Sequence, residues 1–225
     1  MTGAAPVICI DGPSGAGKGT LSQRLATGLG WHLLDSGALY RVVGFAGRLA
    51  AVSLEDSDAV AGVARSLDVD FRPTESGVSV WLAGEDVTAH LRTEEGGRDA
   101  STVAALPSVR EALLLRQQEL ARSPGLVADG RDMGTVVFPR APLKIFLTAS
   151  AEARAERRFR QLQGMGESVS LARLLIDIQQ RDARDQSRAV SPLVPAEDAI
   201  VIDSTALSAD EVLQAARDLA AARDL

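Results

Sequence analysis

The sequence is poor in the residues that form disulfides, zinc sites and guanine-recognition motifs. Among its 225 residues there is no asparagine, one cysteine and two histidines. The absence of asparagine excludes the Asn-Lys-x-Asp motif of GTPases and the catalytic-loop asparagine of protein kinases. The single cysteine, Cys9, excludes an intramolecular disulfide and lies in an apolar run, which favours a core position. With His32 and His90 as the two histidines, a zinc site of Cys and His ligands is not expected.

Long apolar runs and an excess of positive charge are also missing. No apolar run approaches the roughly 18 residues of a membrane span, and the first residues lack the charged-then-apolar pattern of a secretory signal. The net charge of −6 argues against a general nucleic-acid-binding surface. We therefore expect a cytoplasmic protein that binds neither nucleic acid nor membrane.

What remains is the composition of an ordinary globular chain, with 46% hydrophobic and 24% charged residues. A chain of 225 residues is long enough for one domain with inserted subdomains. Its basic residues are all arginines except Lys18 and Lys144. The planar guanidinium of arginine suits two-point contacts with phosphate.

The stretch from Gly12 to Thr20 is the strongest functional pattern in the chain. It follows the short apolar run Pro6–Ile10 and precedes Leu21–Ala26, whose apolar residues have helical spacing. A strand, a glycine-rich turn and a helix in this order predict a phosphate-binding loop, in which backbone N–H groups and the helix N-terminus face the anion. Lys18 would reach the β- and γ-phosphates of a nucleoside triphosphate. The alternative is a tight glycine turn without a chemical role.

Two residues are candidates for binding Mg²⁺. In the general motif a hydroxyl residue directly follows the lysine, whereas here Gly19 does, and the hydroxyl comes at Thr20. This Gly-Lys-Gly-Thr ending resembles the nucleoside monophosphate kinases. Asp129 follows the apolar strand Leu126–Ala128, and an aspartate at that place is the expected partner of Mg²⁺ or its waters. The alternative for Asp129 is a solvated turn.

Polar residues also follow the second predicted strand, Trp31–Leu34. Because ligands of parallel α/β sheets bind at the carboxyl ends of strands, Ser36 and Arg41 are expected to face a binding crevice. Asp35 or Ser36 can also cap the helix that follows to about residue 51, and capping and ligand contact are compatible.

Two later helices carry arginines at helical spacing. From residue 151 onward, Arg154, Arg157 and Arg158 share one face, which predicts contacts with phosphate. A surface helix whose arginines pair with glutamates is the alternative. On the helix that begins near residue 170, Arg181, Asp185 and Arg188 form one stripe that is expected to reach a ligand.

Residues 68–92 differ from the rest in their pattern. Apolar and polar residues alternate along Val69–Arg72 and again along Val78–Ala83. The turn signal Ser76-Gly77 lies between the two runs, and the turn signal Gly84-Glu85 follows the second. This predicts a small antiparallel insert. Capping boxes are expected where Ser108 precedes Glu111 and where Ser208 precedes Glu211.

Five short apolar segments separated by helices predict an α/β fold of the phosphate-loop NTPase type, a five-stranded parallel sheet covered by helices on both faces. We expect a core of residues 1–35, 105–150 and 170–225. A monophosphate-binding region would span 36–104, with the β-insert at about 63–103, and a helical lid would span 151–169.

The chain resembles the bacterial cytidylate kinases of the long form across nearly its whole length. The resembling stretches are Ile10–Thr20, Leu34–Arg41, Asp129–Pro139 and Arg181–Arg188. The first is common to many monophosphate kinases, and the others are far more specific. The resemblance implies transfer of a phosphoryl group from ATP, with Mg²⁺, to CMP or dCMP by a monomeric enzyme.

The resemblance also implies roles for residues, with no departure from the family pattern at these positions. ATP would be bound by Gly12, Pro13, Ser14, Gly15, Ala16, Gly17, Lys18, Gly19 and Thr20. The acceptor nucleotide would be bound by Ser36, Arg41, Ser101, Arg110, Arg131, Asp132, Arg181, Asp185 and Arg188. The groups assigned to catalysis are Lys18, Arg131, Arg157 and Asp129, and those assigned to the metal are Thr20 and Asp129.

Within the acceptor set, Ser36, Arg110, Asp132 and Arg188 would bind cytosine, with Ser101 nearby. Arg41 and Arg131 would bind the phosphate, and Arg181 and Asp185 the sugar. Two alternatives remain from the sequence: a kinase of another small acceptor such as UMP, AMP or shikimate, and a nucleotide-binding switch without enzymatic activity.

Overall fold

The computed structural model describes residues 5–74 and 77–225, and the chain divides into two compact units. One unit comprises the described residues up to Leu34 together with Leu120–Leu225, and the other comprises Asp35–Glu119. The second unit includes the helix Pro107–Gln118. The finer division into core, monophosphate-binding region and lid stays a prediction.

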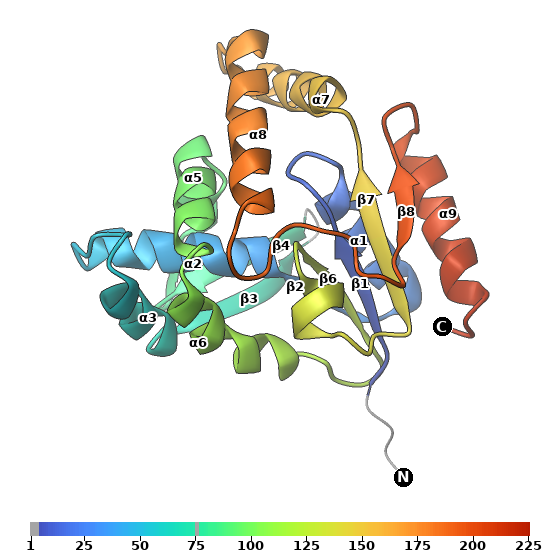
Figure 1. Ribbon diagram of the computed structural model, residues 1–225, viewed down its shortest axis with the longest axis horizontal. Helices are drawn as coiled ribbons and strands as arrows, with labels where there is room; N and C mark the ends of the chain where they lie inside the picture. Colours follow the sequence, from blue (N-terminus) through green and yellow to red (C-terminus); the bar gives the residue numbers. More distant parts are fainter. Residues whose placement is uncertain (1–4, 75–76) are drawn as a thin grey trace. The chain divides into compact units, whose positions relative to one another are not determined.

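The first unit contains the parallel sheet (Figure 1). Its strands are β1 (Val7–Asp11), β2 (His32–Asp35), β6 (Leu126–Gly130), β7 (Leu143–Thr148) and β8 (Ile200–Asp203). Its helical elements are α1 (Lys18–Leu29), the π-helical turn η1 (Met133–Val137), α7 (Ala151–Gly164), α8 (Leu171–Gln186) and α9 (Ala209–Ala221). Over the described residues the strand order is β2-β6-β1-β7-β8, and β1 pairs in parallel with both β6 and β7. The five-stranded parallel sheet flanked by helices is confirmed.

Apolar side chains explain why these segments form the sheet and its cover. All five residues of β1 are buried, as are all five of β6, which is typical of central parallel strands. Ile8, Ile10 and Ile145 pack with Leu25 of α1 and Ala216 of α9, so these two helices share one face of the sheet. Cys9 lies fully buried in β1 as expected, and burial raises the pKa of its thiol well above the usual range.

The second unit is formed by helices and a small antiparallel sheet. Its elements are α2 (Ser36–Leu49), α3 (Ser57–Arg65), β3 (Val69–Thr74), β4 (Gly77–Leu82), β5 (Glu85–Asp86), α4 (Thr88–Leu91), α5 (Glu94–Val103) and α6 (Pro107–Gln118). The strands pair antiparallel in the order β3-β4-β5 over the described residues, which confirms the insert. Of the predicted turn at Ser76-Gly77, Ser76 lies outside the described residues.

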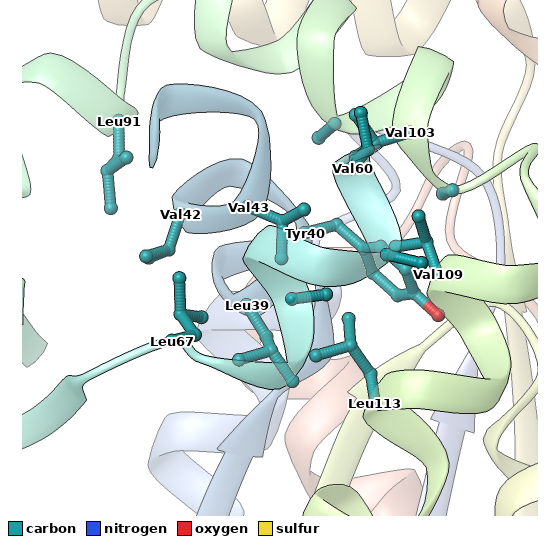
Figure 2. Close-up of a cluster of buried hydrophobic side chains, with 14 of the residues drawn as sticks. Leu39, Tyr40, Val42, Val43, Val60, Leu67, Leu91, Val103, Val109 and Leu113 are labelled. Atoms are coloured by element: carbon teal, nitrogen blue, oxygen red, sulfur yellow. The ribbon is translucent and has the colours of Figure 1, made fainter. Parts of the chain in front are cut away.

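The core of the second unit is built from α2, α3, α5 and α6 (Figure 2). Leu39 and Val43 of α2 lie in one cluster with Val60 of α3, Val103 of α5 and Leu113 of α6. Each of these five side chains is at most 1% exposed. Their burial is the main stabilising contribution to this unit, because each buried aliphatic side chain contributes roughly 1.5–3 kcal/mol.

Two helix starts follow the expected chemistry and one does not. Asp35 caps α2 by accepting from the amide of Ala38, and Ser208 and Glu211 form the expected capping box of α9. The capping box at Ser108 is wrong. Proline at position 107 is already helical, so Leu106 is the N-cap, and the Ser108 hydroxyl instead pairs with Ser57.

The turn that leaves β1 depends on Gly12. Its φ of +145° lies outside the range that L-residues favour. A Cβ atom at this position would lie 2.0 Å from the backbone oxygen of Leu147 in β7. The loop backbone therefore passes against the neighbouring strand at a distance that excludes any side chain.

We expect Gly12→Ala to lower the free energy of unfolding by about 3 kcal/mol or more, because the clash with backbone adds to the strained φ. Urea denaturation would measure the loss. Gly164→Ala is the matched control, since a Cβ there meets nothing within 4 Å and should leave stability unchanged or slightly higher. Equal stability of the two variants would contradict the packing of Gly12 described above.

Candidate functional site

The glycine-rich loop connects β1 to α1, as the sequence predicts. Gly17 precedes the helix with a φ of +100° in the left-handed region, which turns the chain into the first helical residue, Lys18. The side chain of Lys18 is buried and folds back over the loop, where Nζ donates to the Pro13 carbonyl at 3.0 Å. Lys18 Nζ also lies 3.8 Å from Oδ1 of Asp129. The structure thus brings together the predicted lysine and carboxylate.

The surroundings of Lys18 make its ammonium group less stable than in water. Burial is the main cause, and the nearby cations Arg131 and Arg181 add to it, so the pKa of Lys18 falls to about 8. Asp129 and Asp11 oppose the shift without cancelling it. A polyanion bound in the loop would reverse this balance, because it supplies the negative charge that favours protonated lysine.

Asp11 is a site residue to which the sequence analysis gave no role. Its two oxygens accept from the amides of Met133 and Gly134 at 2.9 and 2.8 Å, and this fixes the turn that follows β6. Burial raises the pKa of Asp11 to about 6, although the two backbone hydrogen bonds oppose the shift. Asp11 is the last residue of β1 and lies opposite Gly130, the last residue of β6. A carboxylate at the end of a buried central strand was the signal in the sequence that could have identified Asp11 as a site residue.

The turn after β6 carries Arg131 and Asp132 and connects them with α8. Arg131 Nε donates to Oδ2 of Asp185 at 3.1 Å, and Arg188 donates to Oδ1 of the same carboxylate. Asp185 is 1% exposed. Burial alone would raise the pKa of Asp185, but Arg131, Arg188 and Arg181 outweigh burial and hold it below the usual range.

Asp185 therefore anchors arginines from two segments that are far apart in the sequence. Of the expected stripe, Arg181 and Asp185 lie on α8, whereas Arg188 follows the end of the helix at Gln186 and donates back to Asp185. Arg181 directs NH1 to the hydroxyl of Ser14 in the phosphate loop at 3.2 Å. Asp132 is 2% exposed at the start of η1. The roles of these residues toward the sugar and the base stay predictions.

Arg154 connects both late helices to the phosphate loop, a function that the sequence analysis did not assign to it. Its guanidinium donates to both oxygens of Asp182 on α8, at 3.0 and 2.5 Å. It also donates to the backbone oxygens of Ser14 and Ala149, each at 3.0 Å. Asp182 was missed because no local spacing relates it to Arg154, which lies 28 residues earlier.

Arg157, the predicted catalytic arginine of α7, contacts two loops. It donates to the backbone oxygen of Ser204, to the Ser204 hydroxyl at 3.2 Å and to the Ala16 carbonyl at 3.4 Å. The sequence left two interpretations of this helix open, a phosphate-binding face and a surface face with arginine–glutamate pairs, and they apply to different faces of α7. Arg154 and Arg157 face the loops, whereas Arg160 forms an exposed ion pair with Glu156.

The proposed metal ligands have suitable chemistry but form no preformed cluster. Among the described residues no group of three or more His, Cys, Asp or Glu side chains could hold a metal ion. Asp129 and the exposed Thr20 supply oxygen donors, and a Cβ on Gly19 would lie 3.7 Å from Oδ2 of Asp129. Mg²⁺ favours such a site, because it usually keeps several waters and adds phosphate oxygens to one or two protein ligands.

In the second unit, the predicted acceptor-binding residues lie on three helices: Ser36 and Arg41 on α2, Ser101 on α5 and Arg110 on α6. Ser36 is the first residue of α2, and its hydroxyl donates to Oε1 of Gln117 at 2.8 Å. Arg110 of α6 donates to the Ala104 carbonyl and lies over the ring of Tyr40, 5.6 Å from its centroid. Ser101 is 4% exposed on α5.

Arg41, the predicted phosphate ligand of this unit, is anchored by backbone. NH1 donates to the carbonyls of Leu91 and Thr93 at 2.5 and 3.1 Å, which ties α2 to the junction of α4 and α5. These contacts hold the Arg41 side chain against the backbone between α4 and α5, and its role toward a phosphate stays a prediction.

A parallel sheet whose first strand leads through a glycine-rich loop into a helix with a buried lysine defines a phosphate-loop nucleotide-binding protein. The model of the family described as cytidylate kinase matches residues 8–222. A cytidylate kinase of Aeromonas hydrophila subsp. hydrophila is 60% identical over 95% of this chain and 93% of its own length. One of Salmonella choleraesuis is 58% identical over 96% of this chain and 95% of its own length.

A solved structure of a gluconokinase from Sinorhizobium meliloti 1021 is 16% identical, covers 98% of this chain and 94% of its own, and has a TM-score of 0.47. The family assignment rests on the sequence matches. This chain belongs to the cytidylate kinase family. Among the described residues, the helices lack the combination of length and apolar composition that a membrane span requires.

The state of Lys18 predicts how polyphosphate binding depends on pH. In the free protein Lys18 loses its proton near pH 8, and a bound triphosphate would raise its pKa. Binding above about pH 8 must then take up a proton, so affinity should fall as the pH rises, by up to tenfold per unit. Calorimetry with a non-hydrolysable ATP analogue, in two buffers of different ionisation enthalpy, measures the uptake.

Lys18→Met is the control for this experiment, because the variant has no ammonium group to titrate and should lose the pH dependence above about pH 8. Wild-type affinity that stays constant from about pH 7 to 9.5, with no proton uptake, would contradict the pKa of Lys18 given above.

Proposed function

We propose that this chain transfers the γ-phosphoryl group of ATP to CMP or dCMP, giving ADP and CDP or dCDP. Membership of the cytidylate kinase family over residues 8–222 carries the proposal. A cytoplasmic location and a monomeric state remain expectations from the sequence.

The chemistry needs little from a general base. The acceptor is a phosphate that is already anionic near neutral pH, so the main barrier is the repulsion between two polyanions. The loop Gly12–Thr20 would hold ATP through its amides, and Lys18 would move from the Pro13 carbonyl to the phosphates. Asp129 and Thr20 would hold Mg²⁺, which supplies neutralisation of phosphate charge.

Arg131 of the turn after β6 and Arg157 of α7 would act on the nucleotides through position and charge. Arg131 would bind the acceptor phosphate, and its contact with Asp185 supports this role because it fixes the guanidinium plane. Arg157 would serve the transferring group, and helix α7 with its following loop would form the lid that keeps water from the reaction.

On the acceptor side, Arg41 would bind phosphate, Ser36 and Ser101 would lie at cytosine, and Arg110 and Arg188 would donate to N3 and O2 of the base. Asp132 would accept from the N4 amino group. Uracil reverses the polarity at N3 and at the exocyclic position, so a set of this kind favours cytosine. Arg181 and Asp185 would bind the sugar.

A panel assay tests the proposal against its alternatives. Coupled ADP release is measured with CMP, dCMP, UMP, AMP and shikimate as acceptors, and we expect turnover with CMP and dCMP. Preference for another acceptor would assign a different kinase activity. Absence of turnover with every acceptor would favour the nucleotide-binding switch.

We expect Lys18→Ala to keep its fold and to lower kcat by at least ~10³, because its charge acts chiefly on the transferring phosphoryl group. Arg24→Ala is the control: it removes one positive charge from the same helix, but at an exposed ion pair with Asp210. The control should retain wild-type kcat. A folded Lys18→Ala enzyme with more than about a tenth of wild-type kcat would refute the role of Lys18.

We expect kcat/KM for CMP to exceed that for UMP by at least ~10² in the wild type, because the wrong base leaves buried polar groups unpaired. In Asp132→Ala the ratio should shrink, mainly through loss of CMP activity. Steady-state kinetics with both acceptors measures this. Equal use of CMP and UMP by the wild type would remove the base-recognition roles while leaving a monophosphate kinase.

A further inference from the structure

Ser36 and Gln117 form a buried hydrogen-bonded chain in the second unit. The hydroxyl of Ser36 donates to Oε1 of Gln117 at 2.8 Å, and Nε2 of Gln117 donates to the Leu113 carbonyl at 3.4 Å. Ser36 is 2% exposed and Gln117 is 1% exposed. A fully buried glutamine is uncommon, and its burial here is compatible with stability because both ends of its amide have partners.

The direction of these two hydrogen bonds follows from which atoms can donate and which can only accept. A backbone carbonyl can accept and cannot donate, so the Leu113 oxygen requires the NH₂ end of the Gln117 amide. The other end, Oε1, then faces Ser36 and has no hydrogen to give. The Ser36 hydroxyl has a single hydrogen, which therefore goes to Gln117.

The position of Ser36 leaves its hydrogen few other acceptors. A serine within a helix can donate to the carbonyl one turn earlier, but Ser36 is the first residue of α2 and follows the cap residue Asp35. With its hydrogen committed to Gln117, the Ser36 oxygen presents lone pairs in its remaining directions. Toward a ligand it is an acceptor.

We propose that Gln117 is a positioning residue that sets the hydrogen-bond polarity of Ser36 and thereby favours an amino group over a carbonyl on the pyrimidine acceptor. This inference rests on the proposed function, in which Ser36 lies at the base. The exocyclic amino group of cytosine has two N–H donors, and one of them matches the Ser36 lone pairs. The O4 carbonyl of uracil would place lone pairs against lone pairs.

Gln117→Met tests the proposal with little change in volume or helix propensity. Without Oε1 the Ser36 hydroxyl rotates freely and can donate to O4 of uracil. We expect the ratio of kcat/KM for CMP to that for UMP to fall about tenfold, with UMP activity rising relative to CMP. A residue that acts through packing alone would lower both activities together and leave the ratio unchanged.

Gln118→Met is the matched control, because it makes the same substitution at the next, exposed residue of α6 and should retain the wild-type ratio. Gln117→Glu is the conservative variant. A buried carboxyl is raised in pKa and stays protonated, so it donates to Leu113 and accepts from Ser36 as the amide does. It should keep the wild-type preference.

A double-mutant cycle shows whether Gln117 acts through Ser36. In a Ser36→Ala background, Gln117→Met should leave the CMP-to-UMP ratio unchanged, because the hydroxyl whose direction it controls is absent. Ser36→Ala alone should lower the ratio through loss of CMP activity, and an unchanged ratio in this variant would overturn the proposal even if Gln117→Met does not fold.

The outcomes separate this inference from the proposed function. A wild type without preference for CMP over UMP refutes the proposed base recognition. A wild type with that preference, but with an unchanged ratio in Gln117→Met or in Ser36→Ala, overturns the role of Gln117 and leaves the cytidylate kinase activity standing.

Discussion

The burial of a lysine close to two arginines is the constraint on which the phosphate loop and its surroundings depend. Lys18 is buried within the influence of Arg131 and Arg181, and its pKa falls to about 8. Carboxylates hold these cations in place: Asp129 lies beside Lys18, and Asp185 binds Arg131 and Arg188. Such an arrangement is most stable when a polyanion completes it, because added negative charge lowers the free energy of every neighbouring cation.

Hydrogen bonds also connect α7 and α8 to the phosphate loop. Arg154 pairs with Asp182 across the two helices and donates to the backbone of Ser14, while Arg181 donates to the Ser14 hydroxyl. A movement of the loop backbone at Ser14 would therefore alter hydrogen bonds made by both α7 and α8. This coupling offers a physical route by which nucleotide binding in the loop would move the proposed lid.

In the proposed function, charged groups would supply affinity for the nucleotide phosphates, and neutral hydrogen bonds would help to discriminate between the bases. In the second unit the arrangement around Ser36 contains a serine, a glutamine and a backbone carbonyl, all buried and mutually satisfied. Neutral groups of this kind contribute little to net stability, but a mismatched partner leaves them unpaired at a cost of about 1–3 kcal/mol. In the proposed function, this cost would add to the base recognition by Arg110, Arg188 and Asp132.

The sequence by itself determined the parallel sheet, the phosphate loop and the antiparallel insert, because periodicity and glycine spacing are local properties of the chain. It also singled out Lys18 for phosphate and Asp129 for Mg²⁺, but only the structure shows that the two side chains lie 3.8 Å apart. Tertiary structure alone decided the pairs Arg154–Asp182, Ser36–Gln117 and Asp11 with the turn after β6. Their members are separated by 28, 81 and 122 residues, and no local pattern relates side chains that folding brings together from such distances. The capping box at Ser108 failed because α6 begins earlier than predicted, at Pro107, and the Ser108 hydroxyl pairs instead with the distant Ser57.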